Sequence, residues 1–150
     1  MPTTYSGGCA CGAIRYACSA EPASSLNCHC RDCQRGSGSA YATLLSVPVA
    51  AFTLTKGTPK FYRVIADSQY PVDRGFCSEC GSPVFLKVQR MWDLGFAYLL
   101  AAGLDDPSWV RPMADVWTAS AQPWDSMNPA LPKFERGLTE EQVKELIASR

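Results

Sequence analysis

The stretch Phe76-Cys77-Ser78-Glu79-Cys80-Gly81 decides how this chain folds, because a Cys-x-x-Cys pair followed by glycine is typical of a zinc knuckle. Gly81 can take a positive φ in the tight turn while backbone N–H groups face the thiolates. A second pair is Cys9 and Cys11, whose sulfurs share one face of an extended segment. We therefore predict a structural zinc site on Cys9, Cys11, Cys77 and Cys80.

A metal bridge between such distant parts of the chain would hold its first strand against the hairpin near Cys77. Zinc binding in small peptides is worth about 10–16 kcal/mol, comparable with the whole stability of a domain. The rival interpretation of this motif is a thioredoxin-like redox pair, which needs a neighbouring βαβ unit. Residues Ser82 to Val88 continue as a strand instead. Removing the metal should therefore unfold the domain.

A second cluster stands at Cys28-His29-Cys30-Arg31-Asp32-Cys33. Three thiols close in sequence can converge on one zinc ion and leave its fourth position open for water or a substrate atom. His29 lies between two cysteines of an extended segment and should point away from the metal, beside it or at the surface. The flanking Arg31 and Arg35 are either solvated charges or contacts for the carboxylates of an acidic thiol ligand.

Composition excludes several classes of function. Lysine plus arginine equals aspartate plus glutamate, at 14 each, so nucleic acid is not an expected partner. The start of the chain has no secretory pattern, and the apolar run from Leu94 to Ala102 is too short to span a membrane. We expect a cytoplasmic location, where eight cysteines indicate metal binding rather than disulfides. Cys18 stands outside every group and is expected to be a small buried hydrophobe.

The remaining pattern predicts a mainly β domain of antiparallel sheets. Expected strands are Ala13 to Ala17, Ser39 to Val47, Phe52 to Thr55, Lys60 to Ile65, Ser82 to Val88, Leu94 to Ala102 and Met113 to Thr118. In the proline-rich stretch that follows, Trp124 is expected to cover the core or, alternatively, to close a pocket. Thr139 and Gln142 form a capping box before a short amphipathic helix that should dock on its own domain, with a partner subunit as the alternative. We divide the chain into a zinc-binding domain, residues 1–135, and a helical tail, residues 136–150, and leave its oligomeric state open.

The glycine-flanked Cys9 and Cys11, the run Cys28 to Gly38, and Arg74 to Gly81 together resemble the glutathione-dependent formaldehyde-activating enzyme (GFA) family, to which centromere protein V is related. The likeness extends to Gly103-Leu104-Asp105-Asp106-Pro107 and to Pro123-Trp124, and covers most of the chain up to about Glu135. It implies a β-tent-like fold with two zinc ions, a structural one on the four-cysteine set and an open one on Cys28, Cys30 and Cys33. Asp115 is a departure, since family members often have histidine there.

These observations lead to a hypothesis of a zinc-dependent carbon–sulfur lyase. A small thiol such as glutathione would bind the open zinc and form an S-hydroxymethyl adduct with formaldehyde or a related aldehyde. No general base stands out apart from His29 and scattered carboxylates. The alternative is a non-catalytic module in which both zinc ions are structural and His29 or Cys18 completes the second site. A third interpretation keeps the open zinc but gives it another thiol or electrophile.

Overall fold

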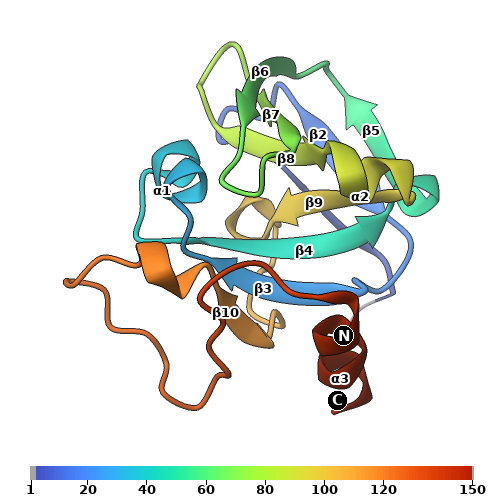
Figure 1. Cartoon of the computed structure of the whole chain (residues 1–150). Coiled ribbons are helices and arrows are strands. Elements are labelled where there is room, and N and C mark those ends of the chain that lie inside the picture. Colours follow the sequence, from blue (N-terminus) through green and yellow to red (C-terminus); the bar gives the residue numbers. More distant parts are fainter. Residues whose placement is uncertain (1–2, 150) are drawn as a thin grey trace.

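The computed structural model describes residues 3–149, which form two β-sheets and three α-helices (Figure 1). The larger sheet has seven strands in the order β10-β3-β4-β9-β8-β7-β6, and the smaller has three in the order β1-β2-β5. The strands are β1 Tyr5–Gly8, β2 Arg15–Cys18, β3 Ser24–Cys28, β4 Ala42–Pro48, β5 Phe52–Lys56, β6 Lys60–Ile65, β7 Pro71–Phe76, β8 Pro83–Val88, β9 Phe96–Leu100 and β10 Ala114–Val116. The helices are α1 Arg31–Ser37, α2 Gln89–Asp93 and α3 Glu140–Ala148, with single 3-10 turns at Val49–Ala51, Ala101–Gly103 and Thr118–Ser120.

The side-chain period of two along β4 divides the interior into two cores. Leu45 and Val47 pack with Tyr16 of β2 in a first core between the two sheets. Leu44 points to the opposite face of the large sheet, where Cys28 of β3 belongs to a second core. Aromatic and aliphatic residues that follow β10 pack against this second core, namely Trp117, Phe134 and Leu138. The second face of the large sheet is therefore covered by the chain's own C-terminal part.

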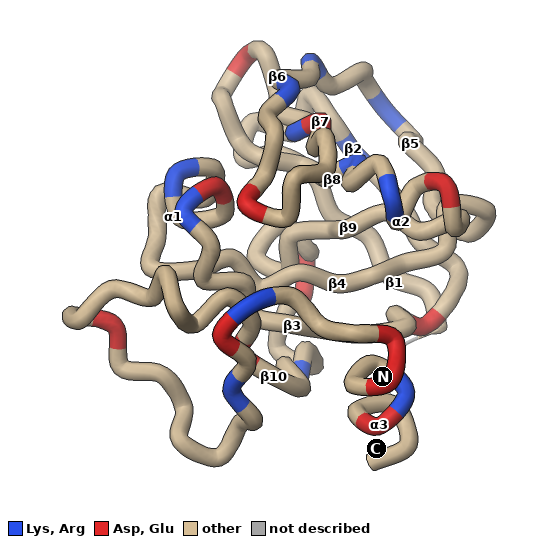
Figure 2. The backbone as a smooth tube through the Cα atoms, viewed as in Figure 1, with Lys and Arg blue, Asp and Glu red and all other residues tan. Residues whose placement is uncertain are grey.

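The central strands β3, β4 and β9 carry no charged residue, and Figure 2 draws them in one neutral colour. Strands that are covered on both faces have no solvent-facing side on which a charge could be hydrated. Positive and negative residues lie instead on the outer strands, the helices and the loops, interspersed with one another (Figure 2). This placement follows directly from the two-core arrangement.

The mainly β fold class is confirmed, and every predicted strand is present, β6 with the predicted bounds and the others with shifted ends. Three further strands, β1, β3 and β7, were not predicted, and β10 runs parallel to β3, with Ala114 opposite Leu26. The large sheet is therefore mixed rather than purely antiparallel. The segment from Cys28 to Cys33 is extended only at its start, because Cys30 caps the N-terminus of α1 and its sulfur accepts from the Cys33 N–H at 3.3 Å.

The C-terminal region contains one confirmed and one wrong prediction. The capping box is present, with the Thr139 hydroxyl accepting from the Gln142 N–H and the Gln142 side chain from the Thr139 N–H. Trp124, expected to cover the core, has 71% of its surface exposed. Its segment loops outward from the sheet in Figure 1, whereas Phe134 and Leu138 provide the covering contacts. None of the helices among residues 3–149 has the length and apolar character of a membrane span.

Two glycines of similar positive φ test how tightly the small sheet is packed. Gly57, before β6, has a φ of 70°, and a Cβ there would overlap the Ala13 carbonyl; Gly95, before β9, has a φ of 84° and open space around it. We expect Gly95→Ala to cost about 1–2 kcal/mol from backbone strain alone. Gly57→Ala should cost at least about 1 kcal/mol more, since the backbone must also move. Urea unfolding of both variants measures the difference, and equal costs would contradict the packing described.

Candidate metal centres

Four cysteines that were predicted to share one ion come together from two distant parts of the sequence. The sulfurs of Cys9, Cys11, Cys77 and Cys80 all lie within 4.8 Å of one another. The Cys9–Cys11 and Cys11–Cys77 sulfur separations are 3.6 and 3.8 Å. A tetrahedral zinc site with Zn–S bonds of about 2.3 Å has sulfur–sulfur edges of about 3.8 Å. The donor set therefore fits a tetrahedral ion, with donors from the β1–β2 and β7–β8 turns.

Hydrogen-bond donors lie close to three of these sulfurs. The Ile14 N–H points at the Cys9 sulfur at 3.2 Å, and the Glu79 N–H at the Cys77 sulfur at 3.4 Å. The Ser82 hydroxyl lies 3.1 Å from the Cys80 sulfur, and its hydrogen bond, with that of the Ser82 backbone, lowers the pKa of Cys80 to about 5. Such donors are what a closed metal site needs, because only the deprotonated thiol is a ligand.

The second cluster lies on the other face of the large sheet. Cys28 ends β3, Cys30 caps α1 and Cys33 lies in the first turn of α1. All three side chains are buried, and their sulfurs lie within 4.8 Å of one another. Hydrogen bonds from the Cys28 and Cys30 thiols hold the pKa of Cys33 well below its usual range, and the Arg74 guanidinium adds to this effect. Together they outweigh the burial of Cys33, which acts in the opposite direction. Hydrogen bonds with Cys30 and Cys33, together with burial, raise the pKa of Cys28 well above its usual range. The three sulfurs thus share protons and negative charge, as a set of ligands for one cation would.

Neither of the two expected candidates supplies a fourth ligand. Among residues 3–149 the group that could hold an ion here contains these three cysteines and no fourth histidine, cysteine or carboxylate. Cys18 belongs to the first core, where it is 1% exposed and its thiol donates to the Ala20 carbonyl at 3.6 Å. The expectation that Cys18 is a small buried hydrophobe is confirmed. His29 points away from the cysteines, as expected, but it is fully buried and not at the surface.

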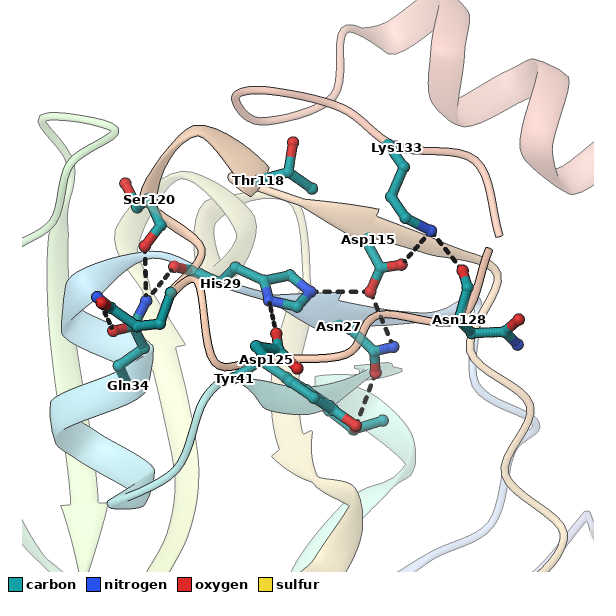
Figure 3. Close-up of polar contacts among 12 residues, drawn as sticks. Asn27, His29, Gln34, Tyr41, Asp115, Thr118, Ser120, Asp125, Asn128 and Lys133 are labelled. Atoms are coloured by element: carbon teal, nitrogen blue, oxygen red, sulfur yellow. Dashed lines mark hydrogen bonds and ion pairs between the residues drawn. The ribbon is translucent and has the colours of Figure 1, made fainter. Parts of the chain in front are cut away.

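His29 is held between two carboxylates behind the cluster (Figure 3). Its Nε2 lies 2.8 Å from Asp115 of β10, and its Nδ1 lies 3.1 Å from Asp125. The ring also contacts that of Tyr41, with the centroids 4.9 Å apart. The side chain positions the turn that carries Cys28 and Cys30 without reaching the cluster.

Asp115 is the centre of this buried polar network. It accepts from Asn27 at 3.1 Å, and its second oxygen lies 2.8 Å from the Lys133 ammonium. Burial opposes ionisation of Asp115, yet hydrogen bonds from Lys133, His29 and Asn27 outweigh that cost and lower its pKa. Asp115 does not line the cavity described next, so its contacts are structural.

A cavity of about 450 Å³ opens beside the three-cysteine cluster, and all three cysteines line it. Its walls come from the second face of the large sheet, from α2 and from α3. Arg31 and Arg35, predicted as carboxylate contacts, are exposed and do not line it; Arg31 donates to Gln34 instead. The structure places Arg74 of β7 there, with its Nη2 3.8 Å from the Cys33 sulfur.

Sequence reasoning missed three charged groups at this site. Arg74 reaches Cys33 by passing over Gly36 of α1, where an added Cβ would lie 2.5 Å from the guanidinium. Asp32 and Asp67 lie with the Cys30 sulfur in a group within 4.8 Å, and Asp67 also lines the cavity. Burial, helped by the nearby Cys30 and Asp67, raises the pKa of Asp32. The one sequence signal for this arrangement was Gly36, because a glycine within a helix allows another side chain, here Arg74, to approach the backbone closely.

Comparisons with known proteins agree with the geometry. Residues 4–120 match the family model described as glutathione-dependent formaldehyde-activating enzyme. A crystal structure of a Rhodobacter sphaeroides protein is similar in fold, with a TM-score of 0.51 and 16% identity over 86% of this chain and 98% of that one. No curated protein matches the sequence.

The four-cysteine cluster should control folding. We expect Cys77→Ser to lower the metal content by one ion per chain and to unfold much of the domain, since a structural zinc contributes about as much as a domain's whole stability. Cys18→Ser, at a buried cysteine outside both clusters, should keep the metal content unchanged. Plasma mass spectrometry and far-UV circular dichroism provide the measurements. The same metal content in both variants would be evidence against this cluster as a metal site.

Asp115 should matter more than a surface carboxylate. Asp115→Asn removes a buried charge that faces His29 and Lys133, and we expect a loss of about 3 kcal/mol at pH 7. Asp105→Asn, which removes a half-exposed ion pair with Arg15, should cost less than about 1 kcal/mol.

The pH dependence provides a second check on Asp115. Since its folded-state pKa is depressed, its stabilisation is fully present above the ordinary carboxyl pKa of about 4 and is lost as the pH falls through the folded-state value. The difference in unfolding free energy between the wild type and Asp115→Asn should therefore shrink below about pH 4. A difference that stays constant down to pH 3 would show that the charge of Asp115 is not what stabilises the fold.

Proposed function

We propose that this chain, which belongs to the glutathione-dependent formaldehyde-activating enzyme family, joins a thiol to an aldehyde at the three-cysteine cluster. In this reaction the thiol sulfur bonds to the aldehyde carbon, the carbon–oxygen π bond opens, and the thiol proton ends on the oxygen. Formaldehyde gives an S-hydroxymethyl adduct. The reverse direction breaks the carbon–sulfur bond and is the lyase reaction.

The observation that carries the proposal is an incomplete donor set facing a cavity. Three buried sulfurs converge, and no fourth protein ligand accompanies them among the described residues. A zinc ion held by Cys28, Cys30 and Cys33 would supply a Lewis acid with an open position, which favours the deprotonated form of an incoming thiol. The four-cysteine cluster would hold a second zinc with a purely structural role.

The chain's own residues contribute position and charge. Arg74 places a positive charge at Cys33, where it offsets the negative charge of a thiolate entering the cavity. Asp67, which lines the cavity near Cys30, can accept a proton from the thiol and return it to the aldehyde oxygen. Burial of the cluster keeps bulk water away from the reacting atoms. Proximity is the main catalytic contribution available to this site.

The non-catalytic alternative needs a fourth ligand to close the second site. The two residues that the sequence offered for this role have other partners, His29 with Asp115 and Asp125, and Cys18 in the first core. We therefore prefer the enzyme over the binding module.

Thiol binding and turnover at the cluster can be measured directly. We expect calorimetry to detect one 2-mercaptoethanol bound per zinc-loaded chain, and exchange NMR to show that the protein accelerates adduct formation with ¹³C-formaldehyde. Cys30→Ser should lose both by at least about tenfold, since it removes one metal ligand. Cys18→Ser should retain both. Equal binding by wild type and Cys30→Ser would rule out the cluster as the thiol site.

A further inference from the structure

The cavity beside the three-cysteine cluster has a distinctive chemical character. Away from the cysteines its walls are mainly aliphatic or aromatic, from the sheet and from the C-terminal tail, with three serines and four charged residues among them. Representative side chains are Leu26, Leu86, Val88, Tyr98, Val143 and Ile147. On the basis of the proposed function, we infer that the thiol substrate of this site is uncharged and predominantly apolar, an alkyl or aryl thiol rather than the tripeptide glutathione.

The charges around the cavity do not match glutathione. The tripeptide carries two carboxylates and one ammonium, and each charged group that enters a cavity needs a partner of opposite sign. The charged lining residues are two arginines and two acids, Arg74, Arg90, Asp67 and Glu140. Arg90 has an ion pair with Glu140 at 4.0 Å, and Arg74 lies against the Cys33 sulfur. Both lining arginines thus already have a negatively charged neighbour, and Arg31 and Arg35 lie outside the cavity.

The volume of the cavity, and the position of its apolar wall relative to the cysteines, suit an apolar substrate chain. At about 450 Å³ the cavity is within the range of small-molecule sites. The cysteines lie at one part of its wall and α3 contributes Val143, Leu146 and Ile147 to another. A thiol whose sulfur meets the cluster can thus extend its carbon chain over apolar surface. Each methylene buried in this way should tighten binding by about fourfold.

This arrangement gives the C-terminal tail a role in specificity. The apolar face of α3 forms part of the surface along which a substrate chain would lie. Residues of the opposite face, such as Lys144, are exposed. A change on the apolar face should therefore alter the affinity for long thiols and leave that for short thiols unchanged.

The test uses the full chain with cobalt(II) in place of zinc, because thiol coordination changes the visible absorption of cobalt. Ethanethiol, butanethiol, hexanethiol and glutathione are titrated at one pH. We expect hexanethiol to bind at least about fiftyfold more tightly than ethanethiol, and glutathione to bind more weakly than butanethiol. Glutathione binding more tightly than hexanethiol, or an affinity independent of chain length, would overturn the inference while leaving the proposed function intact. If no thiol changes the cobalt spectrum, the proposed function itself fails.

A pair of neighbouring variants on α3 tests the tail. Val143→Gln should weaken hexanethiol binding at least about fivefold with no change for ethanethiol, whereas Lys144→Gln should change neither. Val88→Thr, which replaces one methyl group of the sheet wall with a hydroxyl of similar size, provides a second measurement if Val143→Gln does not fold. Equal hexanethiol affinities in all the variants that fold and in the wild type would refute an apolar substrate chain in this cavity.

Discussion

The arrangement of the whole domain depends on four sulfur atoms that lie within 4.8 Å of one another. Thiolates at such separations repel, so the cluster is stable as a set of anions only around a cation. Two of the sulfurs belong to the β1–β2 turn and two to the β7–β8 turn. Holding these turns together fixes the small sheet against one face of the large one, where Tyr16, Leu45 and Val47 form the first core. The opposite face of the large sheet is then left for the second cluster and its cavity.

A buried polar network holds in place the turn that carries the second cluster. His29 contacts Asp115 and Asp125, and Lys133 returns a positive charge to Asp115 (Figure 3). The presence of aspartate where the resemblance suggested histidine thus has a local explanation, because Asp115 contacts His29 on one side and the Lys133 ammonium on the other. It lies outside the cavity lining, so the departure does not remove a group from the cavity wall. Its effect on the site is indirect, through the position of the turn from Cys28 to Cys30.

The sequence allowed the cysteine clusters to be predicted better than their surroundings. Cysteine spacing is local information, and the converging sulfurs of both clusters follow from it. Strands with strong alternation, such as β6, were also predictable, whereas β3, with the sequence Ser-Ser-Leu-Asn-Cys, has too few apolar residues to stand out. Arg74 could not be distinguished from Arg31 or Arg35, because its approach to Cys33 depends on the pairing of β7 far along the chain. Trp124 was misplaced for the same reason, since nothing local says whether a loop folds inward or outward.

On the proposed function, one donor type would serve two purposes in this chain. Four thiolates around a divalent cation form a closed unit with a net charge of about −2, which the partly exposed four-cysteine site can expose to solvent. Three thiolates around the same cation leave about −1 in a buried position, and an incoming thiolate would make it about −2 beside an apolar cavity. Arg74 lies where it offsets part of that charge. Additional carboxylates on the substrate would add negative charge that has no cationic partner, whereas an uncharged carbon chain adds no charge. Electrostatics and cavity shape therefore favour the same class of thiol.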